Sequence, residues 1–153
     1  GMGIGQKHLE AIDNYKNSEV KTICEKDKSK IRILKKKYPN KIITSEENKI
    51  YSDNNINLVS IASYDNYHFS QIKKSIKAQK NIIVEKPLCL NLKEFKEIKK
   101  LLKKNKNVQI TSNLVLRVNS LFKYFKKKTT YKNIINIDAD YIYGRKKKLF
   151  GKF

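Results

Sequence analysis

The stretch IIVEKPL, residues 82–88, places a glutamate and a lysine directly after an apolar run. A strand covered by helices on both faces needs only apolar residues, so Glu85 and Lys86 are expected just beyond its end. Open parallel sheets bind their ligands outside the carboxyl ends of the strands. Among 35 Lys and Arg residues, Lys86 is therefore the one whose position predicts ligand chemistry.

A second polar stretch follows the apolar run at residues 58–62, in the sequence SIASYDNYHFSQI. Ser63, Asp65 and His68 are expected at the same edge of the sheet as Lys86, because they also follow a strand. Of the two histidines, His68 falls near a helix start and His8 within the first predicted helix. A lone histidine is more often structural than functional, so both interpretations stay open for each of them.

The amino end is rich in glycine, with Gly1, Gly3 and Gly5 ahead of a predicted helix. Glycines at a helix N-terminus let backbone N–H groups approach a pyrophosphate, which the helix dipole also favours. The spacing is G-x-G-x-G rather than the usual G-x-G-x-x-G. A flexible tail is the alternative interpretation, and Gly5 is the best single candidate for a binding role.

An acid follows the next predicted strand, at Glu25. A carboxylate about 20 residues after a glycine turn can accept the ribose hydroxyls of NAD, whereas nearby cations can hold the 2′-phosphate of NADP. Lys26 and Lys28 therefore leave NADP open. Without the glycine turn, Glu25 would be an ordinary surface acid.

The elements that would position these residues alternate between short β-branched runs and lysine-rich amphipathic stretches, as in stacked βαβ units. The pattern predicts strands at residues 20–24, 41–44, 58–62, 81–84 and 108–111, and helices at 5–15, 29–38, 46–52, 68–79 and 92–105. The last helix should face the sheet through Leu92, Phe95, Ile98, Leu101 and Leu102. This is a Rossmann-like, doubly wound parallel α/β sheet, in which the strand expected before the glycine turn is missing from the sequence.

The alternation changes after Asn113, so residues 1–113 are predicted as a nucleotide-binding domain and residues 114–153 as the start of a second, α+β domain. A helix is expected at residues 121–128. Residues 134–143 alternate apolar and polar side chains, which predicts a strand with one wet face. We expect the sequence to be truncated at both ends.

The net charge of +21 invites a polyanionic partner. The lysines are spread over nearly every predicted helix, however, which is typical of solvated helix faces. Cys24 and Cys89 lie far apart in apolar runs and are expected as reduced, buried thiols. No apolar run approaches the roughly 18 residues of a membrane span, so we expect a cytoplasmic protein with neither a membrane nor a nucleic-acid partner.

Several motifs follow one another in a recognisable order: GIGQKHL, an acid after the second strand of the fold, IASYDNYH, IIVEKPL, NLVLRVNSLF and ADYIYGR. Together they resemble the glucose-fructose oxidoreductase / inositol dehydrogenase (Gfo/Idh/MocA) family, over nearly the whole chain. The resemblance implies an oxidoreductase that uses NAD or NADP to oxidise a hydroxyl group of a sugar, sugar nucleotide or cyclitol.

The resemblance also implies a role for each candidate residue. Gly3 and Gly5 would form the pyrophosphate turn, although Met2 stands where the family has its middle glycine. Lys86 would contact the substrate and assist proton transfer, because a cation stabilises a developing alkoxide. The remaining expected contacts to the cofactor come from Glu25 at the adenosine ribose, from Ser63, Asp65 and His68 beside the nicotinamide, and from Glu85.

Departures from the family pattern leave alternatives open. Tyr64 and Asp65 replace the proline and asparagine of the family's T-P-N-x-x-H loop, while Arg117 matches an arginine common after the sixth strand. The Asp and His that the family's second domain supplies are absent from the sequence, so enzymatic activity is uncertain. The alternatives are a non-catalytic nucleotide-binding remnant that forms a homo-oligomer through its exposed sheet, and a basic nucleic-acid-binding module.

Overall fold

The computed structural model describes residues 3–130 and 133–140. The chain divides into two compact units, Gly1–Leu114 and Val115–Phe153, which are described separately. Gly1, Met2 and the last three residues of the strand predicted at 134–143 lie outside the described residues.

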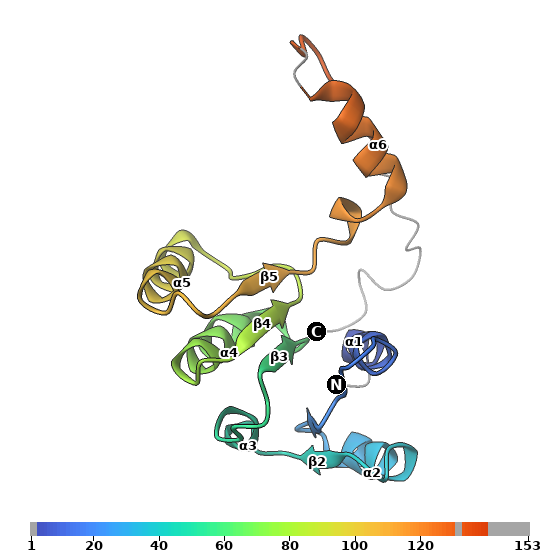
Figure 1. Ribbon diagram of the computed structural model, residues 1–153, viewed down its shortest axis with the longest axis vertical. Coiled ribbons are helices and arrows are strands. Elements are labelled where there is room, and N and C mark those ends of the chain that lie inside the picture. Colours follow the sequence, from blue (N-terminus) through green and yellow to red (C-terminus); the bar gives the residue numbers. More distant parts are fainter. Residues whose placement is uncertain (1–2, 131–132, 141–153) are drawn as a thin grey trace, which may run out of the picture. The chain divides into compact units, whose positions relative to one another are not determined.

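The first unit alternates helices and strands in the predicted order (Figure 1). Most helix and strand ends differ from the predicted ends by one or two residues. The largest difference is at α4, which begins three residues before the predicted start. Tyr64 is still extended there, and Asp65 already starts the helix. The elements are α1 Ile4–Asp13, β1 Thr22–Cys24, α2 Lys28–Lys37, β2 Ile42–Thr44, α3 Asn48–Tyr51, β3 Leu58–Ile61, α4 Asp65–Lys77, β4 Asn81–Val84, α5 Leu92–Lys104 and β5 Ile110–Ser112.

All strand pairs in this unit are parallel, which confirms the Rossmann-like fold class. Within the described residues, the strands form two separate sheets, β1–β2 and β3–β4–β5, and no ladder joins β1 to β3. In the doubly wound order, the strand that precedes the glycine turn lies between these two. The break between the two sheets therefore falls at the position that this strand has in the doubly wound order.

Helix α1 contacts elements of both sheets. In its second turn, His8 hydrogen-bonds Ser60 of β3. At its carboxyl end, Asp13 accepts a hydrogen bond from Val20 N at 2.7 Å and pairs with Lys41 at 2.8 Å, just before β1 and β2 begin. The helix thus connects the two sheets across the missing ladder.

The core lies between the three-stranded sheet and the helices α4 and α5. Its fully or nearly fully buried members are Val59, Ile61, Ile72, Ile76, Ile82, Val84, Ile98 and Val108. Asn91 caps α5 by accepting a hydrogen bond from Glu94 N at 2.9 Å. The prediction for this helix was partly wrong, because only Ile98 is buried there, whereas Leu92 is 64% and Phe95 44% exposed.

The two cysteines are free, as predicted, but both are only partly buried rather than core residues. Cys24 is the last residue of β1, and Cys89 lies in the loop between β4 and α5, so neither is enclosed within the sheet. Burial nevertheless raises the pKa of both thiols above its ordinary value.

The second unit contains a short 3-10 helix, η1 Val115–Arg117, and α6 Ser120–Thr129, capped by Asn119. The strand predicted at 134–143 is not found in residues 133–140, which have no regular secondary structure. An alternating pattern needs a neighbouring strand to form a ladder, and the described residues of this unit offer none. No helix in the described part of the chain is long and apolar enough to cross a membrane.

Candidate functional site

The predicted site residues gather at one edge of the first unit, where the parallel strands end. Ser63 follows β3, Glu85 and Lys86 follow β4, and Asn113 follows β5. The start of α1 reaches the same edge, because a Cβ atom on Gly5 would lie 3.4 Å from the Cβ atom of Ala62. The fold therefore brings the glycine turn, the serine loop and the lysine turn together.

Lys86 is exposed. Within the described residues, its ammonium group has no hydrogen bond or ion pair, and its backbone N–H lies 3.4 Å from Glu85 Oε2. The peptide bond between Lys86 and Pro87 is cis. The lysine thus offers a positive charge that is not neutralised within this part of the protein.

His68 is completely buried beneath two of the site's loops. Its Nδ1 atom is 2.7 Å from the carbonyl oxygen of Pro87, and its Nε2 atom is 3.2 Å from that of Ser63. The ring therefore ties the serine loop to the lysine turn. Its predicted contact with a cofactor stays a prediction, whereas its role in holding the two loops is visible in the geometry.

Glu85 is the centre of a buried hydrogen-bond network. Its Oε1 atom accepts a hydrogen bond from Asn113 Nδ2 at 2.6 Å and lies 2.8 Å from His8 Nε2. The side chains of His8 and Glu85 are each only 11% exposed. On the other side of the imidazole, Nδ1 is 2.6 Å from Ser60 Oγ. Residues from α1, β3, β4 and β5 are thereby joined at one carboxylate.

The network keeps Glu85 ionised. Burial by itself would raise the pKa of this carboxyl group, but the hydrogen bonds from Asn113 and His8 and the charge of His8 outweigh it, so the pKa lies below its ordinary value. A buried carboxylate with two donors is therefore placed directly before the exposed lysine.

The remaining residues predicted after β3 are exposed. Ser63 Oγ donates a hydrogen bond to Gln71 Oε1 at 2.7 Å, which fixes the loop against α4. Asp65 is the first residue of that helix, where a negative charge suits the helix dipole. Both predicted contacts to a cofactor stay predictions, and a role in starting α4 is evident for Asp65.

Glu25 directly follows β1, and its Oε1 atom accepts hydrogen bonds from the backbone N–H groups of Lys26 and Asp27, at 2.8 and 3.1 Å. These bonds hold the carboxylate at the end of the strand. Lys26 turns its ammonium group to the carbonyl oxygen of Ser45, at 2.7 Å. The acid is thus oriented where the sequence predicted it.

The start of α1 suits an anion. Gly3 occupies the N-cap position without any side-chain cap, and the first turn contains no acidic residue. Among the described residues, a Cβ atom on Gly3 would meet nothing within 4 Å, so these residues leave the approach to the turn open. The first N–H groups of a helix have no intrahelical partners and favour negative charge.

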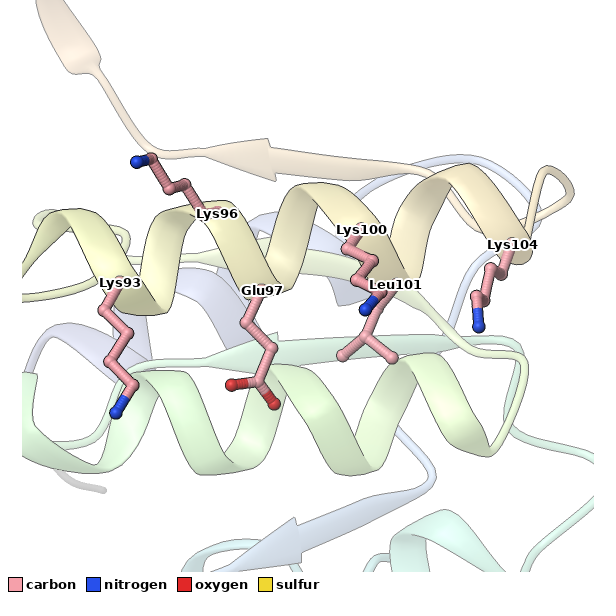
Figure 2. A pocket seen from close by; sticks show the side chains of 6 residues that line it. All are labelled: Lys93, Lys96, Glu97, Lys100, Leu101 and Lys104. Atoms are coloured by element: carbon pink, nitrogen blue, oxygen red, sulfur yellow. The ribbon is translucent and has the colours of Figure 1, made fainter.

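A shallow hollow on α5 lies away from these residues (Figure 2). It is lined by Lys93, Lys96, Glu97, Lys100, Leu101 and Lys104. Glu97 is directed toward α4, where it pairs with Lys73 at 2.5 Å. The lysines of this face are solvent-exposed, as expected for a charged helix surface.

Sequence reasoning missed the importance of His8 and Asn113. His8 lies 77 positions from Glu85, and Asn113 lies 28 positions from it, so nothing local indicates that the three meet. For Asn113 the available signal was its place immediately after a strand, at the edge that holds the other site residues. For His8 it was the spacing within GIGQKHL.

A parallel, doubly wound sheet with a glycine turn at its first helix and an acid after the next strand defines a dinucleotide-binding domain. The family model for the oxidoreductase family with NAD-binding Rossmann fold, GFO_IDH_MocA, matches residues 1–113. The chain therefore belongs to the Gfo/Idh/MocA oxidoreductase family.

Two curated relatives are similar in sequence over the first part of the chain. The uncharacterized oxidoreductase YdgJ of Escherichia coli (strain K12) is 29% identical over 96 residues, and the uncharacterized oxidoreductase YrbE of Bacillus subtilis (strain 168) is 29% identical over 91 residues. The matched parts are 61% and 60% of this chain but only 27% of each relative. The chain thus spans about a quarter of the length of these proteins.

Solved structures show the same fold. The scyllo-inositol dehydrogenase of Lactobacillus casei with bound NAD(H) and scyllo-inositol matches with a TM-score of 0.76 at 19% identity, over 83% of this chain and 38% of that one. The myo-inositol 2-dehydrogenase of Lactobacillus plantarum matches with a TM-score of 0.75 at 22% identity, over the same shares.

Proposed function

We propose that this chain is the cofactor-binding part of an NAD(P)-dependent dehydrogenase that oxidises a hydroxyl group of a sugar, sugar nucleotide or cyclitol. The observation that carries the proposal is the Lys86 ammonium group, exposed and without a partner among the described residues, at the strand edge where the glycine turn also ends. Membership of the family supplies the oxidoreductase class.

The residues present fit a dinucleotide. The open, uncapped start of α1 would receive the pyrophosphate, and Glu25 at the end of β1 would accept the hydroxyl groups of the adenosine ribose. Lys26, the nearest cation in sequence, is hydrogen-bonded to Ser45 O instead of standing open for a 2′-phosphate. This arrangement favours NAD over NADP.

A bound nicotinamide supplies the hydride acceptor, while the protein must manage the proton and the developing charge. Lys86 would stabilise the alkoxide that forms as the substrate hydroxyl loses its proton. Glu85 stays ionised directly before it in the chain and, through its hydrogen bonds with Asn113 and His8, holds the turn that carries the lysine. Ser63 would lie on the rim of the same site.

Cofactor binding is the first test. Titration of the purified chain with NADH, followed by quenching of nicotinamide fluorescence, should saturate, and NADPH should bind more weakly. Absence of binding by either cofactor at millimolar concentration would overturn the proposal.

Turnover is the second test, measured as NAD reduction with scyllo-inositol, myo-inositol, glucose or a uridine diphosphate sugar. Lys86→Ala should abolish any turnover and leave NADH binding intact, whereas Lys96→Ala, on the outer face of α5, should change neither. NADH binding without turnover on any substrate would support the alternative of a non-catalytic nucleotide-binding protein.

A further inference from the structure

The imidazole of His8 connects two turns of the site that lie far apart in the sequence. It belongs to α1, one turn after the glycines, and its Nε2 atom lies 2.8 Å from the carboxylate directly before Lys86. A carboxylate only accepts hydrogen bonds, so Nε2 must donate. The tautomer of His8 is therefore set by Glu85.

Ser60 completes the arrangement from the opposite side. Its hydroxyl group lies 2.6 Å from His8 Nδ1 and can either donate to a neutral ring or, after rotation, accept from a charged one. The imidazole consequently keeps both of its hydrogen bonds in either charge state. At 11% exposure it has little water to replace these partners.

Because of these hydrogen bonds, the carboxylate of Glu85 cannot move independently of α1. Displacement of the helix start would pull His8 from Glu85, and the freed carboxylate would keep only Asn113 and its contact with the N–H group of Lys86. An unpartnered buried acceptor costs more free energy than a lost hydrogen bond between exposed groups. The lysine turn and the glycine turn are thus energetically linked through one imidazole.

We propose that His8 is a positioning residue that couples the two turns, so that occupation of the glycine turn and the placement of the Lys86 ammonium group depend on each other through the Ser60–His8–Glu85 hydrogen bonds. This inference rests on the proposed function for the identity of the ligand. The physical link between α1 and Glu85 is present in the protein without a ligand, and it can be tested separately.

The first experiment needs no ligand and compares His8→Leu, His8→Gln and Gln6→Ala. His8→Leu removes the donor, and His8→Gln retains an amide N–H group that can reach Glu85. Gln6→Ala is the matched control, because Gln6 donates to the carboxylate of Glu10 at 3.0 Å on the same helix. Carbon-13 NMR titration of the Glu85 carboxyl group should show a raised pKa in His8→Leu, a smaller change in His8→Gln and none in Gln6→Ala.

The second experiment follows Lys86 itself. Reductive carbon-13 methylation makes each lysine visible by NMR, and Lys86→Arg identifies the relevant signal. NADH should shift this signal in the parent protein, and the shift should be lost in His8→Leu and partly restored in His8→Gln. NADH affinity in His8→Leu should fall about tenfold, the size of one lost coupling within a shared network.

The outcomes separate the two proposals. If NADH does not bind the parent protein, the proposed function fails, while the Glu85 titration still tests the link. An unchanged Glu85 pKa in folded His8→Leu would overturn the coupling, as would a Lys86 signal that still responds to NADH in that variant. If His8→Leu does not fold, His8→Gln is measured instead, and the coupling is overturned if this variant shows neither the smaller rise in the Glu85 pKa nor a weakened response of the Lys86 signal to NADH.

Discussion

Replacement of Asn113 by alanine tests the energetics of the buried carboxylate most directly. Asn113 Nδ2 donates to Glu85 Oε1 at 2.6 Å, and the exposed fraction of the whole Glu85 residue, backbone included, is 8%. Hydrogen bonds to charged groups contribute about 1.5–3 kcal/mol to stability. His8 remains as a second donor to the carboxylate. We therefore expect Asn113→Ala to lower the free energy of unfolding at pH 7 by about 1.5 kcal/mol, the lower end of this range.

The stability lost in Asn113→Ala should be larger at neutral pH than at acidic pH. The pKa of Glu85 in the folded protein lies below its ordinary value of 4.5, so the ionised network stabilises the protein fully above pH 4.5 and loses this contribution as the pH falls through the depressed pKa. Loss of Asn113 raises that pKa again. At low pH, where the carboxyl group is protonated, the cost should approach that of a neutral hydrogen bond, about 1 kcal/mol or less.

Urea unfolding followed by circular dichroism at several pH values measures this difference, provided that the slope of free energy against urea stays constant. Asn81→Ala is the matched control. Asn81 Oδ1 accepts a hydrogen bond from Gln109 N at 2.9 Å, at the opposite end of the same strand pair and with no charge involved. Equal pH dependence of the two variants, or a cost for Asn113→Ala that is constant with pH, would refute the reasoning.

Three further predictions concern packing and thiol chemistry. Gly5→Ala should leave the free energy of unfolding unchanged or raise it by up to about 1 kcal/mol, because the added Cβ atom makes only an ordinary contact with Ala62; a clear fall in thermal midpoint would contradict this. Ile72→Ala should cost about 2–5 kcal/mol in urea unfolding, since the side chain is fully buried, and a cost below about 1 kcal/mol would show that the core is loosely packed there. Cys24 and Cys89 should react with iodoacetamide at pH 7.5 more slowly in the folded than in the unfolded protein, because burial raises the pKa of both thiols; equal rates would contradict it.

The sequence was sufficient for the order of elements in the first unit and for the position of the candidate residues at the ends of its strands. Apolar runs such as residues 81–84 have a length and a β-branched content that favour a buried strand, and the position of Lys86 relative to that strand follows from the direction of the chain. These inferences need local information and one general rule about parallel sheets.

Tertiary contacts explain what could not be predicted. The burial of His68 depends on two loops that close over it, and the meeting of His8 with Glu85 depends on how α1 lies across β3 and β4. The alternating pattern at residues 134–140 was convincing by itself, but a strand also needs a partner. Each failure therefore concerns a property of pairs of distant segments.

The connection that α1 makes between the two sheets has a consequence for how the first unit opens. His8 contacts Ser60 in one sheet, and Asp13 binds Val20 and Lys41, which lie just before the two strands of the other. Because no ladder joins β1 to β3 in the described residues, we expect native-state hydrogen exchange to resolve the two sheets as separate foldons. Release of β1, β2 and α2 would need the fraying of α1 and the loss of the Lys74–Glu47 and Lys21–Asp53 ion pairs, while β3, β4 and β5 remain protected.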